Sequence, residues 1–283
     1  MALKIEPNGA ICGAIATGID LKDDLSPDLV EELRHHWVQN KLLIFPDQPI
    51  SDADLERITL YFGEFGEDPF FGHIEGHENV AAIQRNAADE TTPIFAEFFH
   101  SDWSFLDVPP AGTMLYGITI PPEGGNTRFA DQVEAYKRLP DDLRDKADSL
   151  TAIHSAELGY SPSGLYGEDD QVSGRSMKII PSERALEKRE HPFVRTHRET
   201  GAKALYSSPA YIQGFAGFEK EESDALMMQF YHHQTADDLV YSHKWDKNML
   251  VMWDNRSLLL AASGGYAGHD RLLHRTTIAD TSF

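Results

Sequence analysis

A series of short, β-rich segments fills the chain after residue 102 and restricts the folds that it can adopt. Each segment is rich in β-branched and aromatic residues and is bounded by Gly, Pro, Asn or Asp, which is the pattern of short strands joined by turns. Two helical stretches, 131–150 and 219–235, interrupt the strands. The pattern predicts a mainly β fold with flanking helices, a sandwich or jelly roll. The expected strands are residues 111–120, 150–156, 191–197, 203–208, 239–245, 248–254 and 271–279.

Two amphipathic helices are expected before these strands. Ser26 precedes Pro27, and apolar residues then recur at helical spacing as far as Trp37. Ser is a common helix N-cap, and Pro is favoured in the first helical turn. A second helix is expected after Ser51, because apolar residues follow it at the same spacing. The apolar run at 41–47 predicts a short buried strand between the two helices.

The chain is expected to form a single domain over residues 1–283. No linker or low-complexity tract divides it, and its 41% hydrophobic content is enough for one large core. The formal net charge of −21 repels nucleic acid and anionic membrane surfaces. The sequence therefore predicts a small-molecule substrate and neither nucleic acid nor a membrane as partner, and it leaves a homo-oligomer open.

Cysteine content and hydropathy indicate a soluble protein of the cytoplasm. The chain has one cysteine, Cys12, which excludes an intramolecular disulfide and any zinc site built from several cysteines. The first residues lack a basic stretch followed by a long apolar run, as a secretion signal would have. No run of 18 apolar residues occurs, so a membrane-spanning helix is not expected.

One short motif indicates a metal site. The segment FFHSDWSF places one residue between His100 and Asp102, and a strand would point both side chains to the same face. An imidazole and a carboxylate can together bind one metal ion. A core histidine beside a surface aspartate would give the same pair, so the motif alone leaves both interpretations open.

Three further motifs follow in order along the chain. PPEGGNTRFAD has a two-glycine turn before Thr127, WDNR lies further on, and RLLHRTT carries Arg271 and Arg275. Together with the first motif, they resemble the taurine and 2,4-dichlorophenoxyacetate dioxygenase family. The segments YFGEFGE and HPFVRTHRETGAKALY are also similar to that family, so the resemblance covers nearly the whole chain.

The resemblance implies a double-stranded β-helix, or jelly roll, that holds Fe(II) and the cosubstrate 2-oxoglutarate. His100 and Asp102 would be the catalytic metal ligands. Thr127 and Arg271 would bind the distal carboxylate of 2-oxoglutarate, and Arg275 would face its C1 carboxylate or an anionic substrate. A planar guanidinium suits such carboxylates, although a surface ion pair would also explain an arginine here. The implied reaction is hydroxylation of a small anionic substrate, with release of succinate and CO2.

The chain departs from the family at the third metal ligand. The family has a histidine just after WDNR, and the matching position here is Leu260, which cannot bind a metal. His269 could replace it only if its glycine-rich loop folded inward. His274 is expected on the opposite face of its strand, and His154 fits substrate contact better than ligation.

Three interpretations of Leu260 remain open. The first is an introduced or incidental change from histidine in an otherwise competent enzyme. The second is a natural enzyme in which two side chains, the cosubstrate and water hold the iron. The third is a binding protein that keeps the pocket and performs no oxidation.

The expected substrate contacts also differ from those of taurine-type enzymes. The positions that would hold the sulfonate-contacting His and Tyr fall on Asp68 and Phe71, and an expected Asn falls on Ala96. With Phe98 and Phe99, these residues predict a more apolar entrance, which is compatible with a small aromatic or aliphatic acid.

Overall fold

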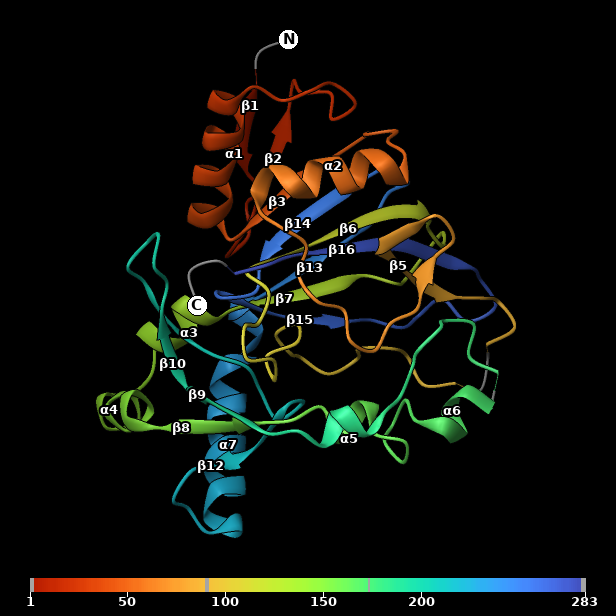
Figure 1. Ribbon diagram of the computed structural model, residues 1–283. Helices are drawn as coiled ribbons and strands as arrows, with labels where there is room; N and C mark the ends of the chain where they lie inside the picture. The colour runs from red at the N-terminus through yellow and green to blue at the C-terminus, as the bar shows by residue number, and fades with distance from the viewer. Residues whose placement is uncertain (1–2, 90–91, 173, 281–283) are drawn as a thin grey trace.

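One large sheet runs through the centre of the molecule (Figure 1). The computed structural model describes residues 3–89, 92–172 and 174–280. In the large sheet the strand order is β1-β2-β3-β14-β6-β16-β5-β4, so strands from both ends of the chain are neighbours. Its pairs are antiparallel except for β2 with β3. The strands are β1 Lys4–Pro7, β2 Ala14–Thr17, β3 Leu42–Phe45, β4 His73–Ile74, β5 His77–Arg85, β6 Gly112–Thr119, β14 Leu250–Asp254 and β16 Arg271–Ile278.

Three smaller sheets complete the β structure. The sheet β13-β7-β15 lies beside the large sheet, and the sheets β12-β8-β9 and β10-β11 lie further from it (Figure 1). Their strands are β7 Thr127–Asp131, β8 Thr151–His154, β9 Arg189–Pro192, β10 Val194–Thr196, β11 Lys203–Leu205, β12 Ile212–Phe215, β13 Val240–His243 and β15 Leu258–Ala262.

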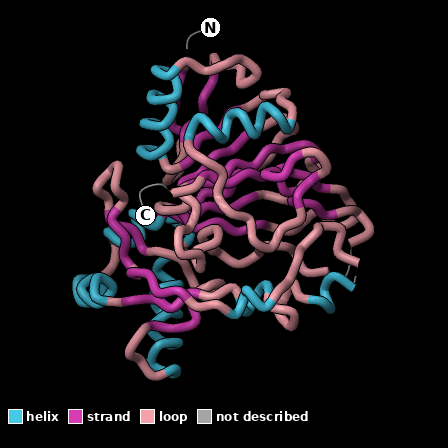
Figure 2. The backbone as a smooth tube through the Cα atoms, viewed as in Figure 1, coloured by secondary structure: helices cyan, strands magenta, loops and turns pink. Residues whose placement is uncertain are grey.

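Helices flank the strands, as the sequence predicted. The helices α1 and α2 lie together on one side of the large sheet (Figure 2). Both begin at the predicted serines, since Ser26 accepts from the backbone of Leu29 and Ser51 forms a capping box with Asp54. The helices are α1 Pro27–Asn40, α2 Asp52–Phe62, α3 Gln132–Lys137, α4 Asp141–Ser149, α5 Glu157–Tyr160, α6 Glu168–Val172 and α7 Lys220–Gln234, with 3-10 turns η1 Glu183–Leu186 and η2 Asp237–Leu239.

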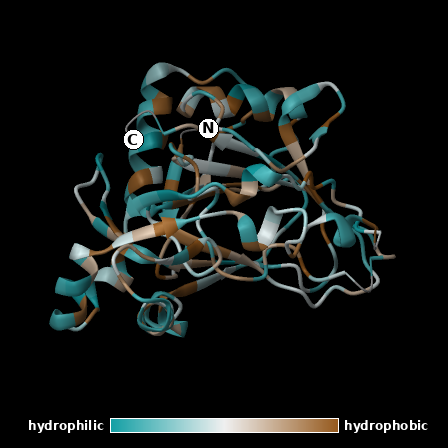
Figure 3. Ribbon diagram, turned by 60° about the horizontal axis from the view of Figure 1, so that its bottom comes forward, coloured by the Kyte–Doolittle hydropathy of each residue, from teal (hydrophilic) through white to brown (hydrophobic). Residues whose placement is uncertain are grey.

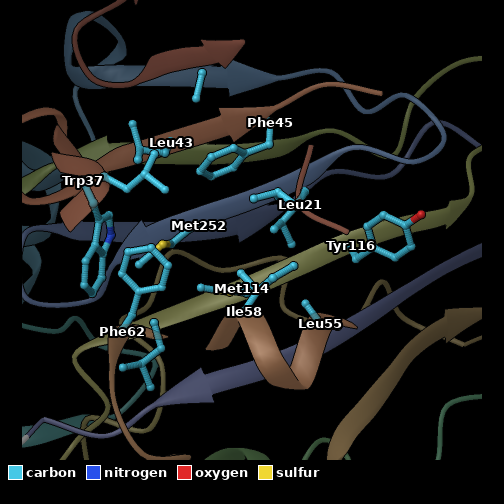
Figure 4. Packing of buried hydrophobic residues seen from close by; sticks show 14 of the residues in the cluster. Leu21, Trp37, Leu43, Phe45, Leu55, Ile58, Phe62, Met114, Tyr116 and Met252 are labelled. Atoms are coloured by element: carbon cyan, nitrogen blue, oxygen red, sulfur yellow. The ribbon is translucent and has the colours of Figure 1, made fainter. Parts of the chain in front are cut away.

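The large sheet is buried on both faces, and its side chains alternate between two cores. On β14, Leu250 and Met252 face α1 and α2, where they pack with the residues shown in Figure 4. Val251 and Trp253 belong to the other core, which includes Phe129 of β7. Successive residues of a strand point to opposite faces, so continuous apolar strands are suited to a sheet that is covered on both sides. In Figure 3, helices at the edge of the molecule are mostly teal, as expected for solvent-facing elements.

The structure refines several predicted elements. The helical stretch 131–150 is two helices, because Pro140 separates α3 from α4 and cannot continue the first one. Sequence reasoning missed β1, β2, β4, β5, β7, β12 and β15. The residues of β1, β2 and β5 are largely polar or small and are held in the sheet by their neighbours. Within the parts of the chain that the structure describes, no helix is both long and apolar enough to cross a membrane.

Candidate functional site

A narrow pocket of about 60 Å³, here called the inner pocket, lies between the large sheet and the small sheet that contains β7 and β15. It collects side chains from both sheets and from the segment before residue 105. Most residues that the sequence analysis selected line it: Phe71, Ala96, His100, Asp102, Thr127, Leu260, Arg271 and Arg275.

His100 and Asp102 present two electron-pair donors to the inner pocket. Nδ1 of His100 lies 2.8 Å from the carbonyl oxygen of Phe98, which can only accept a hydrogen bond. In the neutral imidazole the proton is therefore on Nδ1, and Nε2 is left with its lone pair. Nε2 lies 3.5 Å from Oδ1 of Asp102. Two such acceptors side by side suit a shared cation, and the hydrogen bond on Nδ1 is the kind that orients a ligating histidine.

The carboxylate of Asp102 is held in place by its neighbours. Thr113 donates a hydrogen bond of 2.6 Å to Oδ2, and Nδ2 of Asn255 in turn donates to the Thr113 hydroxyl at 2.9 Å. Burial alone would raise the pKa of Asp102, but the charge of Arg275 and the contacts with His100 and Thr113 outweigh it and hold the pKa well below its usual range. Asp102 is therefore ionised at neutral pH. Sequence reasoning missed Thr113, which has no motif of its own.

Leu260 faces the same pocket as His100. The backbones of the two residues exchange hydrogen bonds of 2.9 and 2.8 Å, so they form a directly opposed antiparallel pair. Side chains of such a pair lie on the same side of the strands. Leu260 lines the inner pocket with 8% of its surface exposed. It thus puts an apolar side chain beside the two donors of His100 and Asp102.

In the parts of the chain that the structure describes, none of the other histidines considered supplies a third donor. His269 is exposed and does not line the pocket. His274 points to the opposite face of β16, as predicted, where Nδ1 contacts Asp52 of α2 at 2.5 Å. Among the described residues, no group of three or more His, Cys, Asp and Glu side chains could hold a metal ion.

Arg271 brings an uncompensated positive charge into the pocket. Its Nε donates to the carbonyl of Gly125 at 3.2 Å, and no carboxylate in the described parts of the chain forms an ion pair with its guanidinium. Burial lowers its pKa to about 10, as expected for a desolvated cation. Thr127 lines the same pocket, and its hydroxyl accepts a hydrogen bond of 3.0 Å from Nε1 of Trp245. The residues present therefore fit a bound carboxylate.

The two-glycine turn before β7 shapes this end of the pocket. Gly124 and Gly125 have φ angles of 70° and 66°, a region that only glycine adopts readily. A Cβ at Gly124 would lie 2.4 Å from the backbone oxygen of Gly265. Glycine is therefore required for the close approach that places the Gly125 carbonyl against Arg271.

Arg275, by contrast, already has two carboxylate partners. Nη1 donates to Oδ1 of Asp68, and Nη2 lies 3.2 Å from Oδ2 of Asp102. Asp68 also accepts from Nε1 of Trp103 and does not itself line the inner pocket. The guanidinium that was expected to face an anion is thus neutralised by the protein.

His154 lies apart from the other selected residues. It belongs to β8 in a separate sheet, and it does not line the inner pocket. It is fully buried beside His191 and Tyr206, and its Nδ1 lies 3.1 Å from Oγ of Ser104. The inner pocket therefore gives no support to the substrate contact expected of His154, and Ala152 of the same strand packs in a core with Phe193 and Phe215.

Comparison with known proteins gives consistent matches. The model of the taurine catabolism dioxygenase TauD, TfdA family matches residues 4–277. An alkylsulfatase of Acinetobacter baylyi is 29% identical over 94% of this chain and 82% of its own length. An alpha-ketoglutarate-dependent 2,4-dichlorophenoxyacetate dioxygenase of Cupriavidus pinatubonensis is 28% identical over 99% of both chains. The solved structure of AAD-2 in complex with Mn(II) and N-oxalylglycine has a TM-score of 0.78 at 25% identity, covering 100% of this chain and 99% of that one.

These matches confirm the predicted jelly-roll fold with flanking helices, and they span all the residues that line the inner pocket. The curated relatives include dioxygenases that depend on alpha-ketoglutarate, which is 2-oxoglutarate. The chain belongs to the TauD, TfdA family and is a 2-oxoglutarate-dependent dioxygenase.

Proposed function

We propose that this chain hydroxylates a small organic substrate in the inner pocket and releases succinate and CO2. Its own residues hold the reactants: His100 and Asp102 bind Fe(II), and Thr127 and Arg271 bind the distal carboxylate of 2-oxoglutarate. When bound, Fe(II) and 2-oxoglutarate would supply the electrons that activate dioxygen for oxidation of the substrate. Arg275 keeps the carboxylate of Asp102 ionised and oriented.

Arg271 is the observation that carries this proposal. A buried arginine without an anionic partner is costly, because desolvation penalises its charge. A dicarboxylic cosubstrate removes that cost, since a guanidinium and a carboxylate can form two parallel hydrogen bonds. The uncompensated charge lies in the same pocket as the donor pair of His100 and Asp102, so one small molecule can reach both.

The expectation of an anionic substrate now has less support. It depended on a free Arg275, whereas this guanidinium is paired with Asp68 and Asp102. The relatives named above include one whose name refers to 2,4-dichlorophenoxyacetate and one that is called an alkylsulfatase. The family therefore supports only the reaction type that we propose. The substrate class has to be inferred from the residues of this chain.

Leu260 favours a second candidate function, in which the chain binds 2-oxoglutarate or a small acid without turnover. The apolar side chain leaves the protein with two metal-binding side chains instead of three. Fewer ligands mean weaker Fe(II) binding, and a site without iron would retain only the carboxylate-binding residues.

Succinate formation distinguishes the two candidates. The purified chain would be incubated with Fe(II), 2-oxoglutarate and a panel of small alcohols, aryl compounds, sulfonates and carboxylic acids, and succinate and dioxygen would be measured. We expect substrate-dependent succinate with a matching loss of dioxygen. Thermal stabilisation by 2-oxoglutarate without succinate would support the second candidate.

Two variants test the assigned residues independently of turnover. Arg271→Ala should weaken 2-oxoglutarate binding by about 1.5–3 kcal/mol, the usual value for hydrogen bonds to charged groups. His274→Ala, which alters a histidine on the opposite face of the same strand, should leave it unchanged. Equal binding by the wild type and Arg271→Ala would exclude the assigned carboxylate site.

A further inference from the structure

We propose, on the basis of the function assigned above, that the substrate is an uncharged molecule with an apolar body, and that Asp68 sets this specificity. Two independent features carry the proposal. One is an apolar cavity that adjoins the inner pocket, and the other is the pairing of Arg275 inside the protein.

A second cavity of about 400 Å³, here called the outer chamber, lies next to the inner pocket. It is within the range of sizes typical of small-molecule sites. Its lining is apolar or aromatic, apart from His100, and includes no Asp, Glu, Lys or Arg. Several exposed hydrophobic side chains gather around it: Phe98 (63%), Leu158 (62%), Leu165 (45%) and Met228 (54%). Such a group of exposed apolar residues on a soluble protein marks a binding site.

The outer chamber adjoins the inner pocket. Ala96, His100, Tyr160 and Tyr211 line both cavities. The rings of His100 and Tyr211 meet edge to face, with centroids 5.9 Å apart. A molecule whose apolar body fills the outer chamber therefore presents one end to His100, where the reaction is expected. With a volume of about 60 Å³, the inner pocket is too small for both the cosubstrate and the apolar body of a substrate. We therefore assign the apolar body of the substrate to the outer chamber.

The charges around the inner pocket leave no position for a substrate anion. Arg271 and Arg275 carry two positive charges, and Asp68 and Asp102 carry two negative ones. A divalent cation and a dianionic 2-oxoglutarate would add nothing to this sum. An anionic substrate would introduce an unbalanced charge in a buried pocket, which is unfavourable.

The other two arginines of the pocket wall already have partners within the protein. Arg175 forms an ion pair with Asp170 at 2.5 Å, and the guanidinium of Arg85 donates to the hydroxyl of Thr92 and to the backbone carbonyls of Asp89 and Pro93. Both guanidinium groups are thus held by the protein, and neither replaces Arg275 as an anion-binding group. An uncharged substrate needs no such group, and the tyrosine hydroxyls of the shared wall can accept or donate a hydrogen bond to a polar end.

Binding of matched ligands tests the proposal without turnover. Calorimetric titration would compare 1-octanol, octanoate and octylammonium, which share a hydrocarbon chain and differ in charge. We expect the wild type to bind 1-octanol at least about tenfold more tightly than either charged ligand. Asp68→Asn should shift the preference toward octanoate by about tenfold or more, because it leaves Arg275 with one carboxylate instead of two. Glu67→Gln, in the neighbouring surface pair with Arg184, should leave the preference unchanged.

A second pair of variants tests the outer chamber. Met228→Asp places a charge on the chamber wall at an exposed helical position and should weaken 1-octanol binding about tenfold or more. Gln229→Asp adds the same charge at the next exposed position of α7, outside the chamber, and should have no effect.

Two results would overturn the proposal: wild-type protein that binds octanoate or octylammonium as tightly as 1-octanol, or 1-octanol binding that Met228→Asp leaves intact. The succinate assay separates these results from failure of the assigned reaction. Loss of the proposed reaction would appear as an absence of succinate formation, whatever the preference among the octyl ligands.

Discussion

At the scale of single residues, Leu260 determines how the inner pocket can hold a metal. Its backbone is paired with His100, and its side chain lies on the same side of the strands as the imidazole. A histidine at this position would add a nitrogen donor to the two donors already present and complete a set of two histidines and one carboxylate, which suits non-haem Fe(II). The two arginines of β16, Thr127 and the hydrogen-bonded neighbours of Asp102 would not have to change.

We therefore predict that Leu260→His raises Fe(II) affinity at least about tenfold, because the loss of a direct ligand should cost more than the 10–100-fold typical of outer-shell changes. Succinate formation should appear or increase with it. Ala262→His provides the control, since Ala262 lines the same pocket two residues further along β15 but is not paired with His100. If both substitutions leave metal affinity and turnover unchanged, the pocket does not bind iron at this position.

At the scale of elements, the end of β14 is tied to its surroundings by a buried ionic network. The carboxylate of Asp254 pairs with Arg256 at 2.7 Å and with His197 at 2.9 Å. Arg256 also pairs with Glu199, which in turn pairs with Arg34 of α1. These contacts join a strand of the large sheet, the turn after β10 and the first helix. They indicate that Asp254 and Arg256 of the WDNR motif stabilise the structure, and neither residue lines the inner pocket.

Removal of one buried partner should be costly, because it leaves the others uncompensated. We predict that Asp254→Asn lowers the free energy of unfolding by about 3–5 kcal/mol, measured by urea denaturation. Asp238 forms an ion pair with Arg138 at the surface, and its side chain is 74% exposed. Asp238→Asn should therefore lower the free energy of unfolding by only about 0–1 kcal/mol. Similar losses for both variants would show that burial of the network does not matter.

The network also predicts a pH dependence. Burial alone would raise the pKa of Asp254, but Arg256 and His197 outweigh it and hold the pKa well below its usual range. A depressed pKa in the folded state stabilises the fold above the unfolded value of about 3.9 and loses that contribution as the pH falls further. The stability difference between the wild type and Asp254→Asn should therefore shrink below about pH 4.

At the scale of the whole molecule, the large sheet interleaves distant parts of the chain. Its centre has β3 from the first 50 residues beside β14, followed by β6 and β16. The core against α1 and α2 and the core against β7 and β15 share these strands. None of these four strands can therefore leave the sheet without exposing both cores, and we propose that residues 1–283 form one domain.

A single cooperative unfolding transition is the expected consequence. Circular dichroism and tryptophan fluorescence should give coincident urea curves, because Trp37 and Trp253 lie in the two different cores. Separate transitions for the two signals would contradict the single-domain proposal. Addition of 2-oxoglutarate should move both curves together to higher urea concentration.

Much of the site could be predicted from the sequence, because its motifs are local. His100 and Asp102 are two residues apart, Arg271 and Arg275 are four apart on one strand, and the glycine turn directly precedes Thr127. Strand geometry places the two arginines on one face, whereas no strand covers His100 and Asp102: His100 forms an isolated bridge with Leu260, and Asp102 lies in the turn that follows. The departure at Leu260 was also visible, since it depends on a position counted from WDNR.

Partnerships between distant residues were decided by the tertiary structure alone. Asp68 and Arg275 are 207 positions apart, and nothing in the sequence near either residue indicates that they pair. His154 has a strand-like neighbourhood, yet its strand belongs to another sheet. The outer chamber brings together residues of α5, α7 and three loops. Local sequence determines the conformation of each segment and the face on which its side chains lie, whereas packing of the segments against one another determines which charges are neutralised and where an apolar cavity remains.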